Sequence, residues 1–359
     1  MTAEAAHVLL FPYLCIRDRL EVGPYELISR RVLAKHDFAV PQLEAEVQGL
    51  LEMYELRSSV AKSFGTVVRR RCGAIGERFE RWEMTLLRRT VVAALLDPIP
   101  RAFRETADAQ GWSIPSSDNA IIYLHQLDGS GHVAIDYGRM VRTLTGGLTI
   151  GDEHSRIHAP SELHAPFLSP DPDPVYLAAL YAELTAAGSQ SRRLGRAIEW
   201  LDLAWRNTTS IDDDTRVVAI YGGFEVLLGK NGALELGVAL ADLLTPGAVK
   251  TMQRIPRRRQ GRRADLQLRS ISETEWWFLF FALLRHDITH GEAIPARQHE
   301  WNDRSHLFLG ESYLRQAIKQ TVANGGHPAV LLDPLERIAQ EYAAVIAQDG
   351  AATKHSPAG

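Results

Sequence analysis

The stretch SETEWWFLFFALLRHDITHG, residues 272–291, decides the fold of the C-terminal half of this chain. Ser272 and Glu275 have the S-x-x-E spacing of a helix capping box, and Gly291 is the residue type that ends helices in a left-handed conformation. The residues between them, EWWFLFFALL, are apolar on nearly every side of a helix. This pattern predicts a helix over residues 272–290 that is central to its domain and packed on several sides.

Further helical patterns surround this segment. Apolar residues recur at helical spacing through the rest of the C-terminal half, and we find no strand signal there. We therefore expect an all-α domain over residues 175–347, followed by a disordered tail at residues 348–359. The other predicted helices span about residues 175–187, 194–206, 212–228, 233–244, 304–323 and 332–347.

The N-terminal part has a mixed pattern and predicts an α+β domain over residues 1–158. Two β-rich runs and two helical patterns are followed by a pair of β-rich runs around a DGSG turn, which predicts a hairpin. The first two β-rich runs are residues 7–16 and 20–29, and the helical patterns are residues 41–64 and 77–96. The runs on either side of the turn are residues 120–127 and 132–138. Five prolines then mark residues 159–174 as a linker, so the chain should hold two domains and be mostly α overall.

Composition bounds the class of protein. The chain has 359 residues, of which 45% are hydrophobic and 23% charged, as expected of a globular protein. Its two cysteines, Cys15 and Cys72, form no CxxC pair, which favours a reducing compartment. No signal peptide or long apolar run is recognisable, so we expect a soluble, cytoplasmic protein without a membrane partner.

The end of the central helix turns abruptly polar, at Arg285, His286, Asp287 and His290. Such side chains are costly at the end of a buried helix unless they meet partners, water or a substrate. Five residues along an ideal helix correspond to about 140° of rotation, so Arg285 and His290 would diverge. We expect the last turn, next to Gly291, to loosen and let the two side chains converge on one cleft.

This residue pair suits RNA cleavage. Histidine exchanges protons near neutral pH, and the arginine fork matches phosphate oxygens. RNA supplies its own nucleophile, the ribose 2′-hydroxyl, so neither a metal nor another cofactor is required. The pair therefore has side chains that suit metal-independent RNA cleavage to a 2′,3′-cyclic phosphate, although Arg and His at a helix end can also occur by chance and satisfy its carbonyls.

The segment LLRHDITHG, residues 283–291, resembles the R-x4-H signature of HEPN domains, especially the Apea-like branch. IYGGFEVLLG at 220–229 is similar to the Glu-containing helix of that branch, and ELGVALADLL at 235–244 to the helix that follows it. The resemblance covers roughly residues 175–345. Glu292 stands where one HEPN subgroup has a tyrosine, so regulation through that tyrosine is not expected.

The resemblance implies a helical bundle, a homodimer, and a ribonuclease of the toxin, RNA-processing or anti-viral defence type. Arg285 and His290 would form the catalytic pair, and His286 would take the polar position after the arginine. Asp287 is a supporting residue of the same turn. The N-terminal domain would act as a sensor or recognition module, and an inhibitor or sensor protein is a further possible partner.

Other residues complete the candidate site. Glu225 lies among apolar neighbours and should have a partner, either Arg285 or His286 on a facing helix or an ordinary surface arginine. A basic loop before the central helix offers phosphate contacts, although it can equally be a solvated loop. Its candidate RNA-binding residues are Arg257, Arg258, Arg259, Arg262 and Arg263.

No cofactor or metal site is predicted. The acidic and histidine-rich segment at residues 152–164 lacks a recognised zinc-ligand spacing and is better interpreted as a surface loop. Gly229 and Lys230 lack the other residues of a phosphate-binding loop. The alternative to a ribonuclease is a non-catalytic HEPN-fold scaffold that binds RNA or protein without cutting it.

Overall fold

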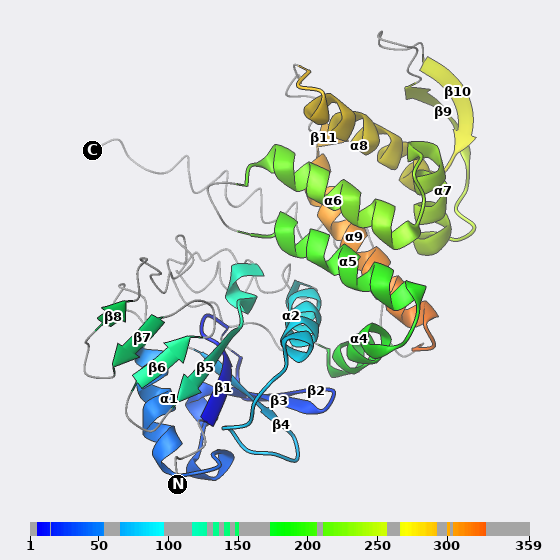
Figure 1. Cartoon of the computed structure of the whole chain (residues 1–359). Helices are drawn as coiled ribbons and strands as arrows, with labels where there is room; N and C mark the ends of the chain where they lie inside the picture. The colour runs from blue at the N-terminus through cyan, green and yellow to red at the C-terminus, as the bar shows by residue number, and fades with distance from the viewer. Residues whose placement is uncertain are drawn as a thin grey trace, which may run out of the picture. The chain divides into compact units, whose positions relative to one another are not determined.

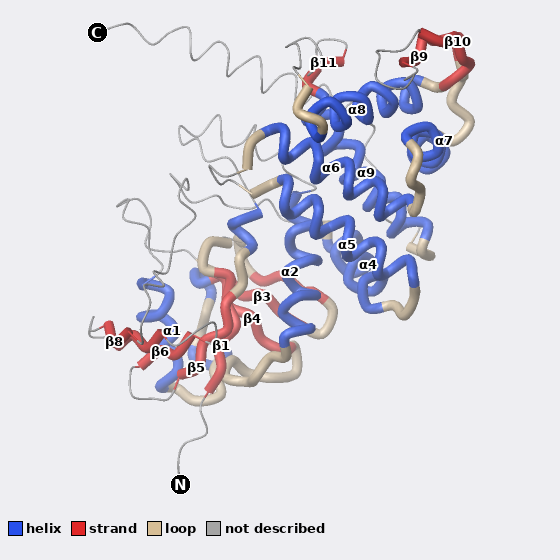
Figure 2. The backbone as a smooth tube through the Cα atoms, turned by 45° about the horizontal axis from the view of Figure 1, so that its top comes forward, coloured by secondary structure: helices blue, strands red, loops and turns tan. Residues whose placement is uncertain are grey.

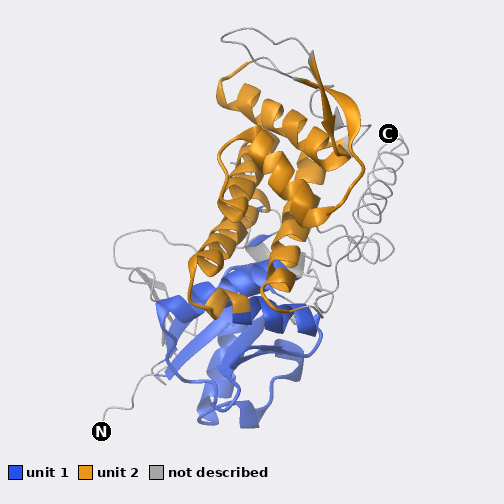
Figure 3. Cartoon of the chain, turned by 90° about the vertical axis from the view of Figure 1, so that its right-hand side faces the viewer, with its two compact units in different colours: residues 1–182, 206–208 blue, residues 183–205, 209–359 orange. Residues whose placement is uncertain are grey.

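The computed structural model divides the chain into two compact units, coloured separately in Figure 3. Unit 1 comprises residues 1–182 and 206–208, and unit 2 comprises residues 183–205 and 209–359. The structure describes residues 6–14, 16–53, 65–96, 117–127, 132–135, 140–143, 148–150, 173–206, 211–256, 266–292, 300–301 and 304–327.

Unit 1 is built on an antiparallel sheet of eight strands in the order β2-β3-β4-β1-β5-β6-β7-β8 (Figure 1). Its central strand β1 pairs with β4 on one side and β5 on the other, with Leu9 opposite Val68 and Leu124. The strands are β1 Ala6–Phe11, β2 Arg19–Val22, β3 Tyr25–Ser29, β4 Thr66–Arg70, β5 Tyr123–Leu127, β6 His132–Ile135, β7 Met140–Thr143 and β8 Leu148–Ile150.

The helices of unit 1 follow the sequence pattern. α1 spans Gln42–Met53, within the helix predicted from residue 41, whose later part lies outside the described residues. Leu43, Val47 and Leu50 of α1 join the core cluster of the sheet, because they recur on one side of the helix. α2 spans Arg81–Leu96 as expected. The short 3-10 helices are η1 Arg30–Val32, η2 Lys35–Asp37 and η3 Ser117–Ala120.

The hairpin predicted around DGSG is confirmed. β5 and β6 pair antiparallel, with Leu127 opposite Val133, and the residues between the strands lie outside the described part. The α+β character predicted for the N-terminal part is therefore correct.

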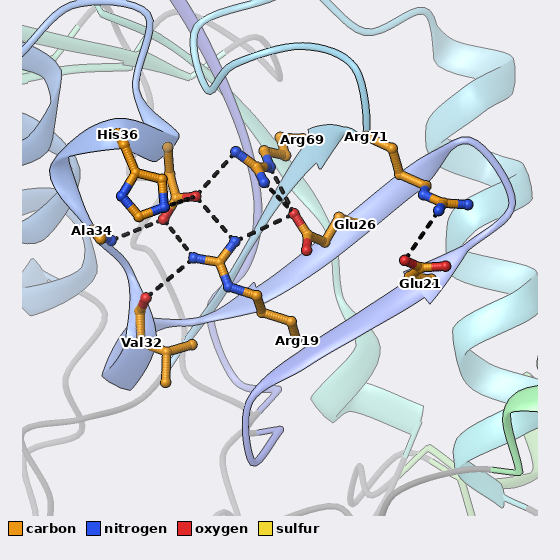
Figure 4. A network of polar contacts seen from close by, with 9 residues as sticks. Arg19, Glu21, Glu26, Val32, Ala34, His36, Arg69 and Arg71 are labelled. Atoms are coloured by element: carbon orange, nitrogen blue, oxygen red, sulfur yellow. Dashed lines mark hydrogen bonds and ion pairs between the residues drawn. The ribbon is translucent and has the colours of Figure 1, made fainter.

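A buried carboxylate fixes η2 to the sheet (Figure 4). Asp37 is fully buried, and its oxygens accept hydrogen bonds from Arg19 at 3.0 and 2.8 Å and from the Ala34 N–H at 2.9 Å. Arg69 lies 3.0 Å from the same carboxylate, and both arginines also contact Glu26. Burial opposes ionisation of Asp37, but the arginine and backbone hydrogen bonds outweigh it and lower its pKa.

Helices dominate unit 2 (Figure 2). α6 packs against α5, α8 and α9, and α8 also packs against α7. Five of the predicted helices are confirmed here, and the one predicted at 332–347 lies outside the described residues. Their bounds are α5 Ser189–Ala204, α6 Asp213–Leu228, α7 Ala233–Leu244, α8 Glu273–Thr289 and α9 His306–Asn324.

Aromatic packing forms the core of unit 2. The rings of Trp277 and Phe281 on α8 stack at 5.2 Å, and Tyr313 of α9 lies 4.4 Å from Trp277. Phe224 of α6 meets Phe278 edge to face at 5.4 Å. Helix α8 is thus the central apolar helix that its sequence predicts.

The expectation that the C-terminal half is all-α is wrong. Strands β9 Thr251–Pro256 and β10 Leu266–Ile271 form an antiparallel ribbon, and Glu300–Trp301 (β11) pairs with Arg304–Ser305 (β12). Among the ribbon residues whose burial is described, only Ile255 and Ile271 are apolar and buried, one in each strand, so the sequence lacks the alternation that marks a half-buried strand. The fold is nevertheless mixed α/β with helix the larger share.

The division between the units falls after Ala182, inside helix α4, which spans Pro174–Thr185. The predicted linker at 159–174 lies almost wholly outside the described residues, as does the predicted tail at 348–359. Among the helices of the described part, none has the length and apolar character needed to cross a membrane.

Candidate functional site

Helix α8 begins after the Ser272 N-cap that its sequence predicts, but within the described residues the Glu275 carboxylate does not complete the predicted capping box. The Ser272 hydroxyl accepts a hydrogen bond from the Glu275 N–H at 3.3 Å and so satisfies one free donor of the first turn. The Glu275 carboxylate is buried and lies 2.7 Å from the Lys250 ammonium group.

The C-terminal end of α8 closes in a Schellman arrangement. Gly291 has a φ of 65°, and its N–H donates to the Ile288 carbonyl at 3.1 Å. The Glu292 N–H reaches back to the Asp287 carbonyl at 2.9 Å. Only a residue without a β-carbon adopts such a φ at no steric cost, which explains the glycine.

The last turn remains helical up to His290. The His290 N–H donates to the His286 carbonyl at 3.1 Å, so the helical ladder continues to that residue. The loosening that was expected to bring His290 toward Arg285 is therefore not seen, because the Schellman closure acts only after His290.

The structure brings His286 and His290 together. These residues are four positions apart and share one side of the helix, and their ring centroids lie 4.1 Å apart at 43°. His290 is exposed and His286 is half-buried. Two imidazoles thus lie side by side at a solvent-accessible helix end.

Arg285 points elsewhere. Its guanidinium carbon lies 4.9 Å from the centroid of the Tyr221 ring on α6, a cation–π contact. Its Nε is buried and has no hydrogen-bond partner among the residues that the structure describes. In the described part of the chain, no hydrogen bond or ring contact joins Arg285 to His290.

Glu225 and Arg285 both influence Tyr221, but the described residues do not show the direct partnership that one of the sequence alternatives proposed. Burial raises the pKa of Tyr221, Glu225 raises it further, and Arg285 lowers it. Both charged groups therefore act on the same phenol, although no ion pair between Glu225 and Arg285 occurs among the described residues. Asp287 is buried on the same helix turn.

Sequence reasoning missed a second group of charges, between α6 and α9. Glu311 is only 9% exposed and has no hydrogen bond or ion pair within the described ranges. Burial raises its pKa to about 8, Arg315 and Arg216 oppose this, and Asp213 adds to it. An acidic residue in the largely apolar run HLFLGESYL was the available signal.

The second group lies close to the middle of α8. Gly310, next to Glu311, is so close to Phe281 that an added β-carbon would lie 3.1 Å from that ring. The first half of α9 therefore packs on the middle of α8, ahead of its polar last turn.

The candidate RNA-binding arginines Arg257, Arg258, Arg259, Arg262 and Arg263 lie outside the described residues, and so does the histidine-rich segment at 152–164. Of that basic region, the structure describes the two strands of the ribbon that flank it. Comparison of the chain with family models, with curated proteins and with solved structures finds no match in any of the three.

Proposed function

We propose that unit 2 is a metal-independent RNA endonuclease whose site is the last turn of α8. One observation carries this proposal: the rings of His286 and His290 lie 4.1 Å apart at an exposed helix end, and Arg285 precedes them directly. Proton-transfer groups and a permanent cation are the two components that cleavage of a phosphodiester requires.

The chemistry follows from these side chains. The exposed His290 takes the proton of the ribose 2′-hydroxyl, and O2′ attacks the neighbouring phosphorus. The O2′–P bond forms and the P–O5′ bond breaks. A protonated imidazole of the same pair returns a proton to the leaving O5′, which gives a 2′,3′-cyclic phosphate and a 5′-hydroxyl without a redox change.

Arg285 is assigned the positive charge in this proposal, although its guanidinium lies on Tyr221 of α6 and not beside His290. The ring of Tyr221 holds its guanidinium from one side, and Glu225 adds negative charge nearby. Fixing the cation in advance lowers the entropy that phosphate binding costs. Arginines between β9 and β10 would add further phosphate contacts. Changing Arg257, Arg258 and Arg259 together to Ala should therefore lower the salt dependence of RNA binding.

The working form proposed here is a homodimer, since two copies of the helix end would surround a phosphodiester more fully than one. An active species that stays monomeric at every concentration in sedimentation experiments would contradict it. Unit 1 would act as sensor or recognition module in a cytoplasmic toxin or anti-viral defence effector.

A second candidate function is a non-catalytic scaffold that binds RNA or protein. The position of Arg285 favours it, because a guanidinium packed on Tyr221 contributes to helix packing whether or not a substrate is present. The regular last turn also keeps Arg285 and His290 about 140° apart around the helix axis.

Purified protein incubated with total RNA in EDTA separates the two functions. The ribonuclease should cleave, leave 2′,3′-cyclic phosphate ends, and fail on an oligonucleotide that carries 2′-deoxyribose at the cut position. RNA that is retained but stays intact would favour the scaffold. Strict dependence on a divalent ion, or equal cutting of DNA, would refute the proposed mechanism.

A further inference from the structure

The ribbon of β9 and β10 has two different faces. Its register places Arg254 opposite Leu268 and Met252 opposite Ser270 on one face, and Ile255 and Ile271 on the other. Residues directly opposite in an antiparallel pair share a face, and successive residues alternate between faces. The face with Met252, Arg254 and Leu268 is called the outer face below.

The inner face holds the ribbon to unit 2. Ile255 and Ile271 are buried, and the Trp276 indole N–H in the first turn of α8 donates to the Arg254 carbonyl at 3.2 Å. The direction of the outer face is therefore fixed by packing. In Figure 1 the ribbon lies at the end of α8 where that helix begins.

The outer face exposes apolar side chains that do not help to pack the ribbon on unit 2. Met252 is 62% exposed and Leu268 59%, and Arg254 between them is exposed as well. Apolar groups gathered on an exposed strand ribbon invite association, so this combination marks an interaction surface.

Charge selects the partner. Residues 250–271 contain eight basic residues and one acid, a formal charge of +7 in a chain whose total is −4. The remaining residues therefore carry −11. Such a concentration of arginine in an acidic protein fits a polyanion, since each arginine can release a condensed counterion from a phosphate backbone.

We infer that the outer face binds an unpaired strand of RNA, with bases against Met252 and Leu268 and phosphates at Arg254. In a duplex the base faces are stacked on one another and hidden, so the apolar side chains would gain no contact. In a single strand those faces are free to pack on a protein surface. The inference names the substrate class of the proposed ribonuclease and rests on that function for its biological meaning.

The distance to the proposed cleavage site sets the length of the probe. Helix α8 has 17 residues. It therefore separates the ribbon from His290 by about 25 Å, which a stacked strand covers in about seven nucleotides. A 12-nucleotide oligouridylate is long enough to reach both places.

Binding is tested on full-length protein carrying His290→Ala, so that the probe is not consumed. Fluorescence anisotropy compares labelled oligouridylate alone with the same strand paired to oligoadenylate. Met252→Ser with Leu268→Ser should weaken single-strand binding on the order of tenfold and leave its salt slope unchanged. Arg254→Ala should lower the logarithmic salt slope by about 0.7, the value for one single-strand phosphate contact.

The matched control is Val40→Ser, which removes an exposed apolar side chain from unit 1. It should bind like the parent, and circular dichroism checks that each variant folds. Equal affinity for the duplex, or variants that bind as tightly as the control, would overturn the inference. If the variant with Met252→Ser and Leu268→Ser no longer forms a dimer but binds RNA like the parent, the outer face is a protein interface instead. Because binding is measured without cleavage, an inactive wild type would refute the proposed function and leave this result standing.

Discussion

Replacing Glu311 by glutamine should remove a pH-dependent loss of stability from unit 2. The carboxyl group is buried between α6 and α9 without a hydrogen bond or ion pair among the described residues. Its pKa is raised from 4.5 to about 8 by burial, against the influence of Arg315 and Arg216. Glutamine has nearly the same shape and never ionises.

The sign follows from proton binding. Between the unfolded pKa and the folded pKa the native state holds a proton that the unfolded chain has released, so the free energy of unfolding falls as pH rises. One pKa unit corresponds to about 1.4 kcal/mol, so wild type should lose on the order of 3 kcal/mol between pH 5.5 and 8 through this group. Above that range the folded carboxyl also ionises and the dependence should end.

Urea unfolding followed by tryptophan fluorescence measures the free energy of unfolding of unit 2, because five of the seven tryptophans lie in that unit. The difference in free energy of unfolding between wild type and Glu311→Gln should change by about 3 kcal/mol between pH 5.5 and 8. His125, whose pKa burial lowers to about 3, titrates the same way in both proteins and cancels. Parallel pH profiles for the two proteins would refute the reasoning.

Three further changes test other parts of the structure. Asp37→Asn should destabilise unit 1 by about 2–3 kcal/mol in urea unfolding, less than for a fully buried pair because its arginine partners are partly exposed. Wild type should lose the same stabilisation as pH falls below about 4 through the lowered pKa of Asp37. Ser272→Ala should cost about 1 kcal/mol of the free energy of unfolding through loss of the α8 cap, and no change would contradict that role. Tyr221→Leu should slow RNA cleavage about fivefold by removing the ring under Arg285, whereas Tyr221→Phe should retain the rate.

Local patterns predicted most of the helices, and for α8 they also predicted both ends, whereas α5 begins five residues before its predicted start. Ser272, Glu275 and Gly291 act within a few residues of themselves, so spacing alone marks where α8 begins and closes. The DGSG hairpin is equally local. The apolar run before Arg285 also predicted that α8 would be central, because a helix that is apolar all round has to be covered on several sides.

The sequence did not predict the contacts between residues that are far apart in the chain. Tyr221 and Arg285 come from two helices, and neither residue type specifies the other. The partners of Asp37 lie on separate strands, and the charges around Glu311 come from both α6 and α9. The β9–β10 ribbon was missed for a different reason. Only Ile255 and Ile271 are apolar residues of its buried face, and the arginines between them in the sequence suggest a loop.

The catalytic proposal was limited by geometry that a motif does not contain. R-x4-H spacing gave the residues, but the loosening of the last turn that we expected from the neighbouring Gly291 was wrong. The Schellman closure after His290 keeps that turn helical and pairs His290 with His286 instead of Arg285. A regular helix was the simpler expectation from the rotation of about 140° between the two positions.

The rate at which His290→Ala cleaves a defined single-stranded RNA in EDTA tests the central proposal most directly. His36→Ala is the matched control, because His36 is an exposed histidine of unit 1. The proposal predicts that His290→Ala loses on the order of 10²–10⁴ in rate while His36→Ala cleaves like wild type. Cleavage by His290→Ala at the wild-type rate would contradict the assignment of the site to the end of α8.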